Sequence, residues 1–525
     1  MLSSHLRNNQ HLISLLALAA LAMAARIHIT LLDFNSLLNT FLVDDAFYDF
    51  KVVANFAHTH RITYDGEGLT NGFHPLWMLI ITPFYTAANH GLDFVTRVMW
   101  IMLAIQTLSV LMLYLNLSRL RAGWWLSFAG AAILALHSTM VDFESNGLET
   151  SINTLALLAL LYSFIGVYQG KDFCWKRYAW FGGAAATAFL ARTDNAIALL
   201  VLFAILFCNL FSGSTDSPAN PIRKPLFALV GSGCIAAVLV SPWLLWNLVN
   251  FGSIVQTSGK VESIFIGEPH FDWQATVASL MLSPISIHNA TTTLVKLFFY
   301  PDGYHPVLSA VLLAVWVIAL YTLLRPDQKH LALRAAAWFS FAVFLVFCYH
   351  ASLRHFVRSW YSVAAGLALF AGFFALLAHM QTQKSLSMAA NVVITAWLAS
   401  VLWLHSPTKL AGASDFTSPH IVGSNWINSH LPADAVIGSM NSGILGYLVD
   451  RKVINLDGVM DIRSLQAHWQ KKETAYLHER GIGYLVDNEG SLRIFCKENP
   501  FHTCETLYTF GSAINPGKVV KINAK

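Results

Sequence analysis

The stretch LVDDAFYDFKVVANFAHTHRITYDGEGLTNGFHPLW, residues 42–77, lies between two long apolar runs at 12–32 and 95–117. A helix needs about 20 apolar residues to cross a bilayer, and both runs have that length. A polar loop between two such runs predicts a chain that leaves the membrane, forms a structured loop on one side and returns. The stretch therefore indicates an α-helical membrane protein with polar residues gathered at the membrane surface.

The composition of the whole chain agrees with a bilayer as solvent. Of its 525 residues 55% are hydrophobic and 12% are charged, and the mean hydropathy is +0.53. Soluble domains carry about 25% charged residues. The net charge of +4 is spread over short loops and forms no basic stripe of the kind that binds nucleic acid. We therefore expect membrane lipids, and no nucleic acid, among the partners.

The pattern of apolar runs predicts about eleven spans. Alternate connections carry most of the basic residues, beginning at Arg7 and ending at Lys384. By the positive-inside rule these connections are cytoplasmic, so we expect a multi-pass protein of the cytoplasmic membrane with its N-terminus inside and its C-terminal part outside. The expected spans are 12–32, 95–117, 125–141, 151–169, 178–191, 195–211, 226–246, 306–324, 335–350, 361–380 and 388–405.

Two segments decide whether the number of spans before each later connection is odd or even, and so on which side of the membrane that connection lies. Residues 74–90 are apolar enough to cross, but a span there would put Arg119 and Arg121 outside, so we predict an interfacial or re-entrant helix. Residues 178–211 carry Arg192 and Asp194 in their middle, which predicts a hairpin whose tip reaches the outer surface.

The chain divides into two predicted domains. Residues 1–405 form the membrane domain, with a first outer loop at 33–73 and a large outer loop at 247–305. A linker is expected at 406–418 (SPTKLAGASDFTS), followed by a soluble domain at 419–525 outside the cytoplasm.

Short apolar runs in the soluble part are typical of buried strands: AVIGSM, KVINLDG and GIGYLVD. Residues 461–480 have helical spacing, so we predict a small α/β domain. The six cysteines form no CxxC motif and no cluster at zinc spacing. Cys496 and Cys504 fall in this domain, and an oxidising compartment would allow them to pair; the sequence leaves both states open.

The quoted stretch opens with two acids directly after an apolar run. From Asp44 to Ala57 the spacing is helical, with Asp44 and Tyr48 near one face and Asp45 and Asp49 on the next. One interpretation is structural: Asp44 caps the helix and Asp45 complements its dipole. The other is a reaction site. The segment NGFHPLW favours the second, because it returns the chain to the membrane with a His and a Trp at the interface.

The run from Asp44 to Trp77 resembles the first-loop signature of bacterial GT-C glycosyltransferases, in which paired acids follow the first span and a TNGFHPLW segment follows an aromatic-rich helix. The chain is more distantly similar to protein O-mannosyltransferases, lipid A aminoarabinose transferases and mycobacterial arabinofuranosyltransferases. The resemblance covers most of the chain in order, continuing at NGLET (146–150), ARTD (191–194), PWLLWN…FGSIVQTSGK (242–260), RSWY (358–361) and NSGILGYLVDRKVINLDG (441–458).

The resemblance implies a hexosyl- or pentosyltransferase that uses a polyprenyl-phosphate-linked sugar and a glycan, lipid or protein acceptor. Physical chemistry agrees, because nucleotide sugars are not available outside the cytoplasmic membrane. In one inverting displacement, a carboxylate takes the acceptor's hydroxyl proton as its oxygen attacks the anomeric carbon, and the lipid phosphate leaves. The reaction needs a base for the hydroxyl proton and positively charged side chains that bind the leaving phosphate. We predict no cofactor; a divalent metal is not excluded.

Asp44 is the predicted base, with Asp45 holding it or binding the acceptor; two adjacent carboxylates raise the pKa of one of them. For the phosphate we predict Arg358 with Arg354 and His355, because arginine binds phosphate through a bidentate fork. Anchoring of a helix end is the structural alternative for these three. Lys51 and Lys260 are further phosphate candidates.

Glu149, Arg192 and Asp194 lie at the outer ends of predicted spans, where a structural salt bridge between spans is the alternative. Asp457, after KVINLDG, either caps the next helix or joins the site. The expected substrate-binding residues are Tyr48, Asn71, His74, Glu149, Arg192, Asp194, Trp360 and Tyr361.

Three other functions fit the same topology. A transporter would carry polar residues near span centres and broken helices in matching halves. Here there is no internal repeat, and the charged residues gather at the outer ends. An oligosaccharide ligase with a pyrophosphate-linked donor is the second alternative, and a non-catalytic scaffold is the third.

Overall fold

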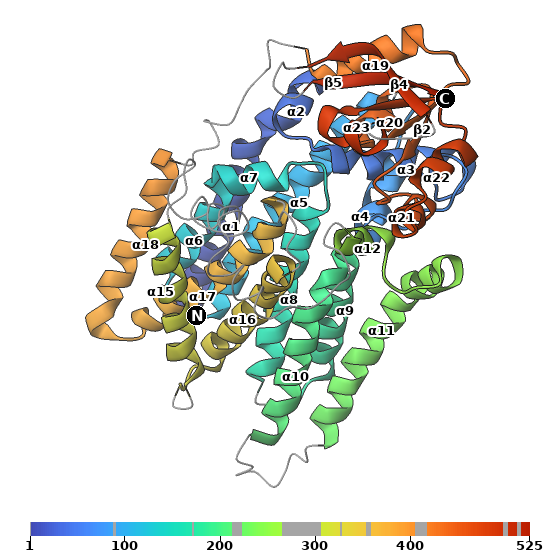
Figure 1. Cartoon of the computed structure of the whole chain (residues 1–525). Helices are drawn as coiled ribbons and strands as arrows, with labels where there is room; N and C mark the ends of the chain where they lie inside the picture. The colour runs from blue at the N-terminus through green and yellow to red at the C-terminus, as the bar shows by residue number, and fades with distance from the viewer. Residues whose placement is uncertain are drawn as a thin grey trace.

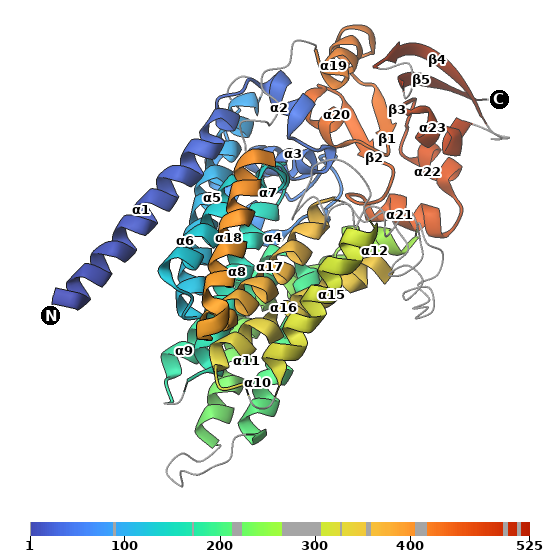
Figure 2. The ribbon, with the colours of Figure 1, turned by 90° about the vertical axis from the view of Figure 1, so that its left-hand side faces the viewer.

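The computed structural model places a bundle of long helices beneath a small soluble domain, which lies across one end of them (Figures 1 and 2). The N-terminus of α1 (Leu2–Thr30) lies toward the other end of the bundle (Figure 2). The structure describes residues 2–87, 91–170, 173–212, 223–264, 306–325, 328–352, 359–404, 417–496, 502–511 and 516–524.

Within these residues, eight helices are long and apolar enough to cross a membrane, or nine if α6 (Trp124–Leu136) and α7 (Ser138–Glu144), which meet at 58°, form one span. Ten of the eleven predicted spans coincide with one helix each, and the predicted span 125–141 is divided between α6 and α7. The predicted helical multi-pass membrane protein is confirmed. The other helices at predicted spans are α5 (Leu92–Arg119), α8 (Thr150–Tyr168), α9 (Trp175–Ala191), α10 (Ala196–Ser212), α11 (Arg223–Phe251), α15 (Pro306–Leu324), α16 (Leu331–Ser352), α17 (Ser362–Gln381) and α18 (Lys384–Leu404). Of these, α9 and α15 are not among the helices that meet the length and hydropathy expected of a span.

The segment that bears on parity forms only α4 (Pro75–Ile81) and the short turn Thr82–Phe84. Ten residues of helix rise about 15 Å, half of what a bilayer core requires. The described part of this segment, up to residue 87, is therefore too short to cross a bilayer as a helix.

Apolar packing divides into a core among the span helices and a second cluster above it. The second cluster joins α2 (Phe34–Thr40), α3 (Asp44–Thr59), α4 and the outer part of α5 to Trp243 of α11 and to Ile444 and Met460 of the soluble domain. The first outer loop is therefore the layer between the membrane helices and the soluble domain.

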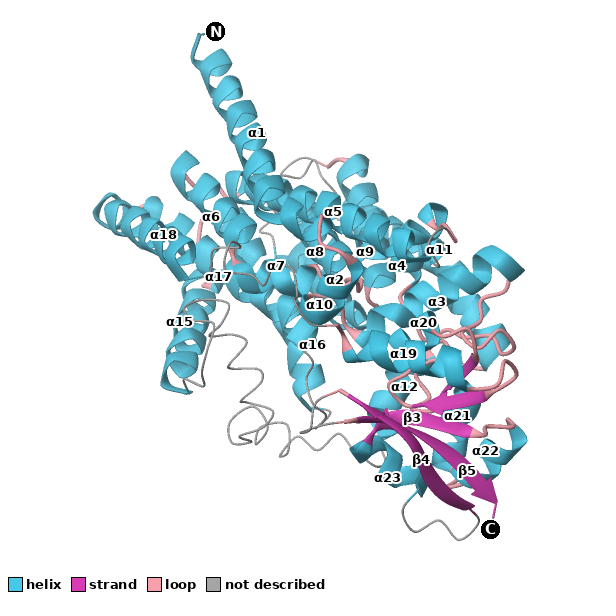
Figure 3. Cartoon of the chain, turned by 90° about the horizontal axis from the view of Figure 1, so that it is seen from above, coloured by secondary structure: helices cyan, strands magenta, loops and turns pink. Residues whose placement is uncertain are grey.

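The soluble domain is built on a five-stranded mixed sheet with the order β2-β1-β3-β5-β4 (Figure 3). β1 pairs parallel with β2 and β3, whereas β5 runs antiparallel to β3 and β4. The three predicted strands and the helical 461–480 region are present; β4 and β5 were not predicted. The strands are β1 (Val436–Ser439), β2 (Lys452–Asn455), β3 (Tyr484–Asn488), β4 (His502–Phe510) and β5 (Gly517–Ala524).

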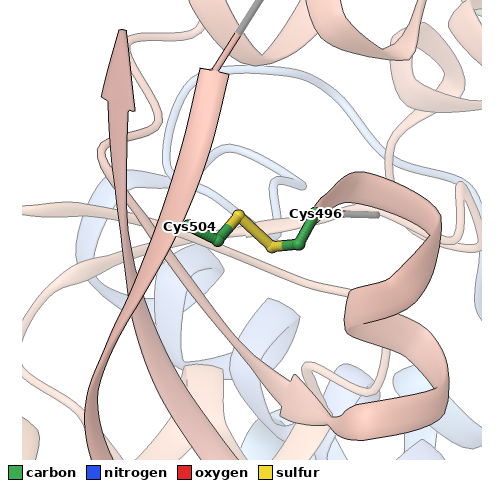
Figure 4. Close-up of a disulfide and its surroundings, with 2 residues drawn as sticks. All are labelled: Cys496 and Cys504. Atoms are coloured by element: carbon green, nitrogen blue, oxygen red, sulfur yellow. A yellow bond between two sulfur atoms is a disulfide. The ribbon is translucent and has the colours of Figure 1, made fainter. Parts of the chain in front are cut away.

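Five helices accompany this sheet: α19 (Pro419–His430), α20 (Gly443–Leu448), α21 (Ile462–Trp469), α22 (Glu473–Glu479) and α23 (Glu489–Cys496). A disulfide joins Cys496, at the end of α23, to Cys504 in β4 (Figure 4). Of the predicted linker only residues 417–418 lie within the described residues.

Candidate active site at the domain junction

Helix α3 begins with the acid pair, but neither acid caps it through a side chain. Val43 is the N-cap, and Asp44 and Asp45 occupy the first turn. The Asp44 carboxylate instead accepts the backbone N–H groups of Gly443 at 3.0 Å and Ile444 at 2.8 Å, where α20 begins. N–H groups at a helix start have no partner within their own helix, and a negative charge complements them. Asp44 therefore attaches the soluble domain to α3.

The two backbones approach closely at this point. A Cβ atom built on Gly443 would overlap the backbone carbonyl of Asp44. The buried Tyr48 hydroxyl donates to the Met440 carbonyl at 3.2 Å and accepts from the Ser442 N–H at 3.3 Å. Tyr48, which is predicted to bind substrate, is thus bonded to the soluble domain.

Gly443→Ala tests this close approach. The added methyl group has no space, so we expect α20 to shift away from α3 and stability to fall by about 1–3 kcal/mol, the usual cost of overpacking. Thermal unfolding of the purified full chain in detergent measures the effect. Gly483→Ala is the matched control, because a Cβ there meets no atom within 4 Å. Equal unfolding temperatures for the two variants would contradict the contact.

Ion pairs extend the junction at the far side of the first loop. The nearly buried Asp65 carboxylate binds Arg480 and lies 3.2 Å from Arg463. Glu67, which is half exposed, binds Lys452 and lies 3.0 Å from Arg480. Exposed pairs contribute little on their own, so Asp65 makes the more important contact.

Three further carboxyl groups surround the junction. Asp45 and Asp49 lie one turn apart on α3, and Asp49 is only 4% exposed. Burial, with the charges of Glu149 and Asp45, raises the pKa of Asp49 well above its usual value. Asp457 follows β2 and accepts the Val459 N–H at 2.9 Å. Burial, with the charges of Asp45 and Asp44, raises the pKa of Asp457 to about 7. Asp45 therefore lies between a buried acid and an acid of the soluble domain.

The raised pKa of Asp457 predicts a pH dependence of stability. Its ordinary pKa is 3.8, so between about pH 4 and 7 the folded chain holds a proton that the unfolded chain has lost. Stability must then fall as pH rises through that window and level off above it. Comparing unfolding temperatures at pH 5 and pH 8, Asp457→Asn should lose less stability than the wild type. The exposed Asp434→Asn is the control and should match the wild type. Equal losses in Asp457→Asn and the wild type would contradict the assignment.

Beneath α3 lies a buried ion cluster that includes the predicted hairpin tip. Arg192 binds Glu149 and lies 2.7 Å from Asp194. His74 approaches Glu149 at 3.5 Å, and His350 approaches Asp194 at 2.7 Å.

An aromatic ring completes this cluster. The Arg192 guanidinium lies 4.5 Å from the centre of the Tyr361 ring, and His350 stacks on the same ring at 4.3 Å. Residues from NGFH, NGLET, ARTD and RSWY, far apart along the chain, are thereby brought together.

Other predicted site residues lie at the edges of this arrangement. Lys51 is half-buried on α3, where burial lowers its pKa and Asp450 partly restores it. Lys260 is half-buried on α12 (Thr257–Ile264), and Trp360 packs against the first-loop cluster. Asn71 is fully buried and bonded to α11 and α12. Outside the described residues lie Arg354, His355 and Arg358.

Sequence reasoning did not select Asp49 or His350 as site residues. Asp49 follows Asp45 by one turn, and His350 ends the predicted span 335–350, so both carried a positional signal. Among the described residues, no group of three His, Cys, Asp or Glu side chains is arranged to hold a metal ion.

Comparison with known proteins shows which solved structures have a similar fold. Residues 415–517 match a family model described as a domain of unknown function (DUF8728). Curated protein sequences give no match. The crystal structure of ArnT from Cupriavidus metallidurans bound to undecaprenyl phosphate has a TM-score of 0.56 and 12% identity, covering 96% of this chain and 97% of that chain.

The apo crystal structure of the Archaeoglobus fulgidus oligosaccharyltransferase has a TM-score of 0.54 and 14% identity, covering 98% of this chain and 74% of that chain. At such low identities the likeness is one of fold, and it extends over the membrane helices and the soluble domain together.

Proposed function

We propose that this chain, which has the GT-C fold of membrane glycosyltransferases, transfers a hexose or pentose from a polyprenyl-phosphate donor to an acceptor outside the cytoplasm. The observation that carries the proposal is the position of Asp45. It lies in the first turn of α3, where its charge adds to burial in raising the pKa of Asp49 on the same helix and of Asp457 in the soluble domain. A base at this level can meet both a lipid phosphate in the headgroup layer and a water-borne acceptor.

We propose Asp45, rather than the predicted Asp44, as the general base, because Asp44 is bonded to the start of α20. Both carboxylate oxygens of Asp44 accept N–H groups from α20. Burial raises the pKa of Asp44 and these two hydrogen bonds only oppose that rise, but they engage both carboxylate oxygens with the soluble domain. Asp44 then holds α3 against the soluble domain and so fixes the position of its neighbour. Asp45 takes the acceptor's hydroxyl proton while the acceptor oxygen attacks the anomeric carbon.

A lipid-linked donor is supported by the fold and by the place of the site. The ArnT structure of the same fold holds undecaprenyl phosphate. In this chain the acids and cations gather where the span helices end, which is the level of lipid phosphates. Arg192 already binds two carboxylates, so the leaving phosphate requires other cations. Lys260, Lys51, and the predicted Arg354, His355 and Arg358 remain the candidates for that role.

The proposed orientation puts the soluble domain outside the cytoplasmic membrane. Basic residues on alternate connections support it. The Cys496–Cys504 disulfide supports it as well, because disulfides form and persist in oxidising compartments. A glycan, a lipid headgroup or a protein can reach the junction from that side.

The test is release of the carrier lipid. Purified full chain in detergent receives a panel of undecaprenyl-phosphate-linked hexoses and pentoses with an envelope extract as acceptor. We expect undecaprenyl phosphate to appear only when a matching donor and the extract are both present. Turnover of a pyrophosphate-linked oligosaccharide alone would favour the ligase, since the fold is shared with an oligosaccharyltransferase. Movement of lipid across vesicles without turnover of any donor would favour a transporter.

A further inference from the structure

Beneath the first outer loop, the Asn71 side chain joins two helices. Its Nδ2 donates to Oδ1 of Asn247 on α11 at 3.0 Å, and its Oδ1 accepts the Thr257 N–H, where α12 begins, at 3.0 Å. The Thr257 hydroxyl donates to the same oxygen. Asn71 is completely buried, so it fixes the relative position of the two helices.

Near this connection, three buried polar atoms have no partner among the described residues: Nε1 of Trp243, Nδ2 of Asn247 and Oε1 of Gln256. Their side chains belong to residues that are 9%, 0% and 5% exposed. Buried polar groups in folded proteins almost always have hydrogen-bond partners, so each exception requires an explanation. A bound ligand with complementary groups supplies one.

The three atoms belong to one region. Trp243 and Asn247 lie one turn apart on the same face of α11. Gln256 directly precedes Thr257, which the Asn71 side chain holds near Asn247. Trp243 is kept in place by rings on either side, with Phe73 at 5.3 Å and Trp246 stacked at 5.3 Å.

The chemistry of these atoms specifies the ligand. The indole N–H is only a donor, and Nδ2 of Asn247 is a donor too, so the ligand must present acceptor oxygens. Oε1 of Gln256 is an acceptor, so the ligand must also present a hydroxyl group. Lys260 lies one turn beyond Thr257 on α12, which places a cation in the same region. Acceptor oxygens, a hydroxyl and a negative charge together describe a sugar phosphate.

We propose that Trp243 and Asn247 donate hydrogen bonds to the phosphate of the lipid-linked donor, and that Gln256 accepts one from a sugar hydroxyl. Lys260 balances the phosphate charge. This inference rests on the proposed function, and it assigns the donor's phosphate to residues on α11 and α12. The donor then lies beneath the first outer loop, with its anomeric carbon toward Asp45.

Binding, not turnover, tests the proposal. The purified full chain in detergent is titrated with undecaprenyl phosphate, and separately with undecaprenol and with inorganic phosphate. Trp243→Phe keeps the ring but removes the N–H donor, so affinity for undecaprenyl phosphate should fall about tenfold, the loss of roughly one charge-assisted hydrogen bond. Trp180→Phe is the matched control, because Trp180 is exposed on α9, and it should change affinity less than about twofold.

Asn247→Asp provides a second variant in case the first fails to fold. It keeps an oxygen that accepts from Asn71 but replaces the free N–H donor with a negative charge. The affinity for undecaprenyl phosphate should therefore fall more than in Trp243→Phe. Undecaprenol should bind the wild type and both variants equally.

The outcomes separate the two proposals. Wild-type binding of undecaprenyl phosphate that neither Trp243→Phe nor Asn247→Asp weakens would overturn the inference and leave the proposed function standing. Binding of inorganic phosphate that depends on Trp243, without binding of the lipid, would overturn the lipid donor and indicate a soluble phosphate ligand. Failure of the wild type to bind either phosphate would contradict both.

Discussion

Asp45→Asn is expected to lower sugar transfer by roughly 10²–10⁴-fold, the usual contribution of a general base. The amide keeps the size of the carboxyl group but cannot accept a proton at neutral pH. Donor binding should survive, because the proposed phosphate contacts lie on α11 and α12. Initial rates of undecaprenyl phosphate release and the affinity for undecaprenyl phosphate measure the two quantities separately.

Asp44→Asn is the companion substitution, one residue away in the same turn. Asparagine can accept only one of the two N–H groups that Asp44 accepts from Gly443 and Ile444. We expect a lower unfolding temperature and a smaller loss of turnover than in Asp45→Asn. The reverse result, a dead Asp44→Asn that unfolds like the wild type beside an active Asp45→Asn, would return the base to Asp44. Full activity in both variants would refute a first-loop base.

Arg192→Gln should have the largest effect on stability. Arg192 is the cation between Glu149 and Asp194, and all three side chains are nearly buried. Removing one partner of a buried ion cluster leaves uncompensated charge and costs about 3–5 kcal/mol. We expect the variant to unfold at a much lower temperature or not to accumulate in the membrane.

Arg121→Gln is the control for this substitution, because Arg121 is exposed at the end of α5. This variant should unfold at the same temperature as the wild type. An Arg192→Gln protein with wild-type unfolding and turnover would show that the cluster does not support the site.

Local patterns in the sequence were sufficient to predict most of the helices and strands. Helical spacing after Asp44 predicted α3, and the charged pair Arg192 and Asp194 in an apolar stretch predicted the turn between α9 and α10. Runs such as KVINLDG predicted buried strands, and β1 and β2 are found paired in parallel. These features follow from periodicity and solvent preference, which a short window of sequence contains.

Contacts between distant segments could not be predicted in this way. The partners of Asp44 lie about 400 residues along the chain, at Gly443 and Ile444. No spacing within the first loop distinguishes an acid that binds another helix from one that accepts a substrate proton. The partners of Asn71 are likewise distant in sequence, at Asn247 and Thr257. The resemblance identified the segments that meet, and the fold determined which side chains touch.

The central claim is that the bond broken lies between the anomeric carbon and the phosphate oxygen, and an isotope label tests it directly. The donor is prepared with oxygen-18 at the oxygen that bridges sugar and phosphate, and the wild-type protein turns it over with acceptor present. Attack at the anomeric carbon predicts that all of the label stays in the released undecaprenyl phosphate. Label found in the sugar product would mean that the phosphorus–oxygen bond had broken, which would contradict glycosyl transfer from a lipid phosphate.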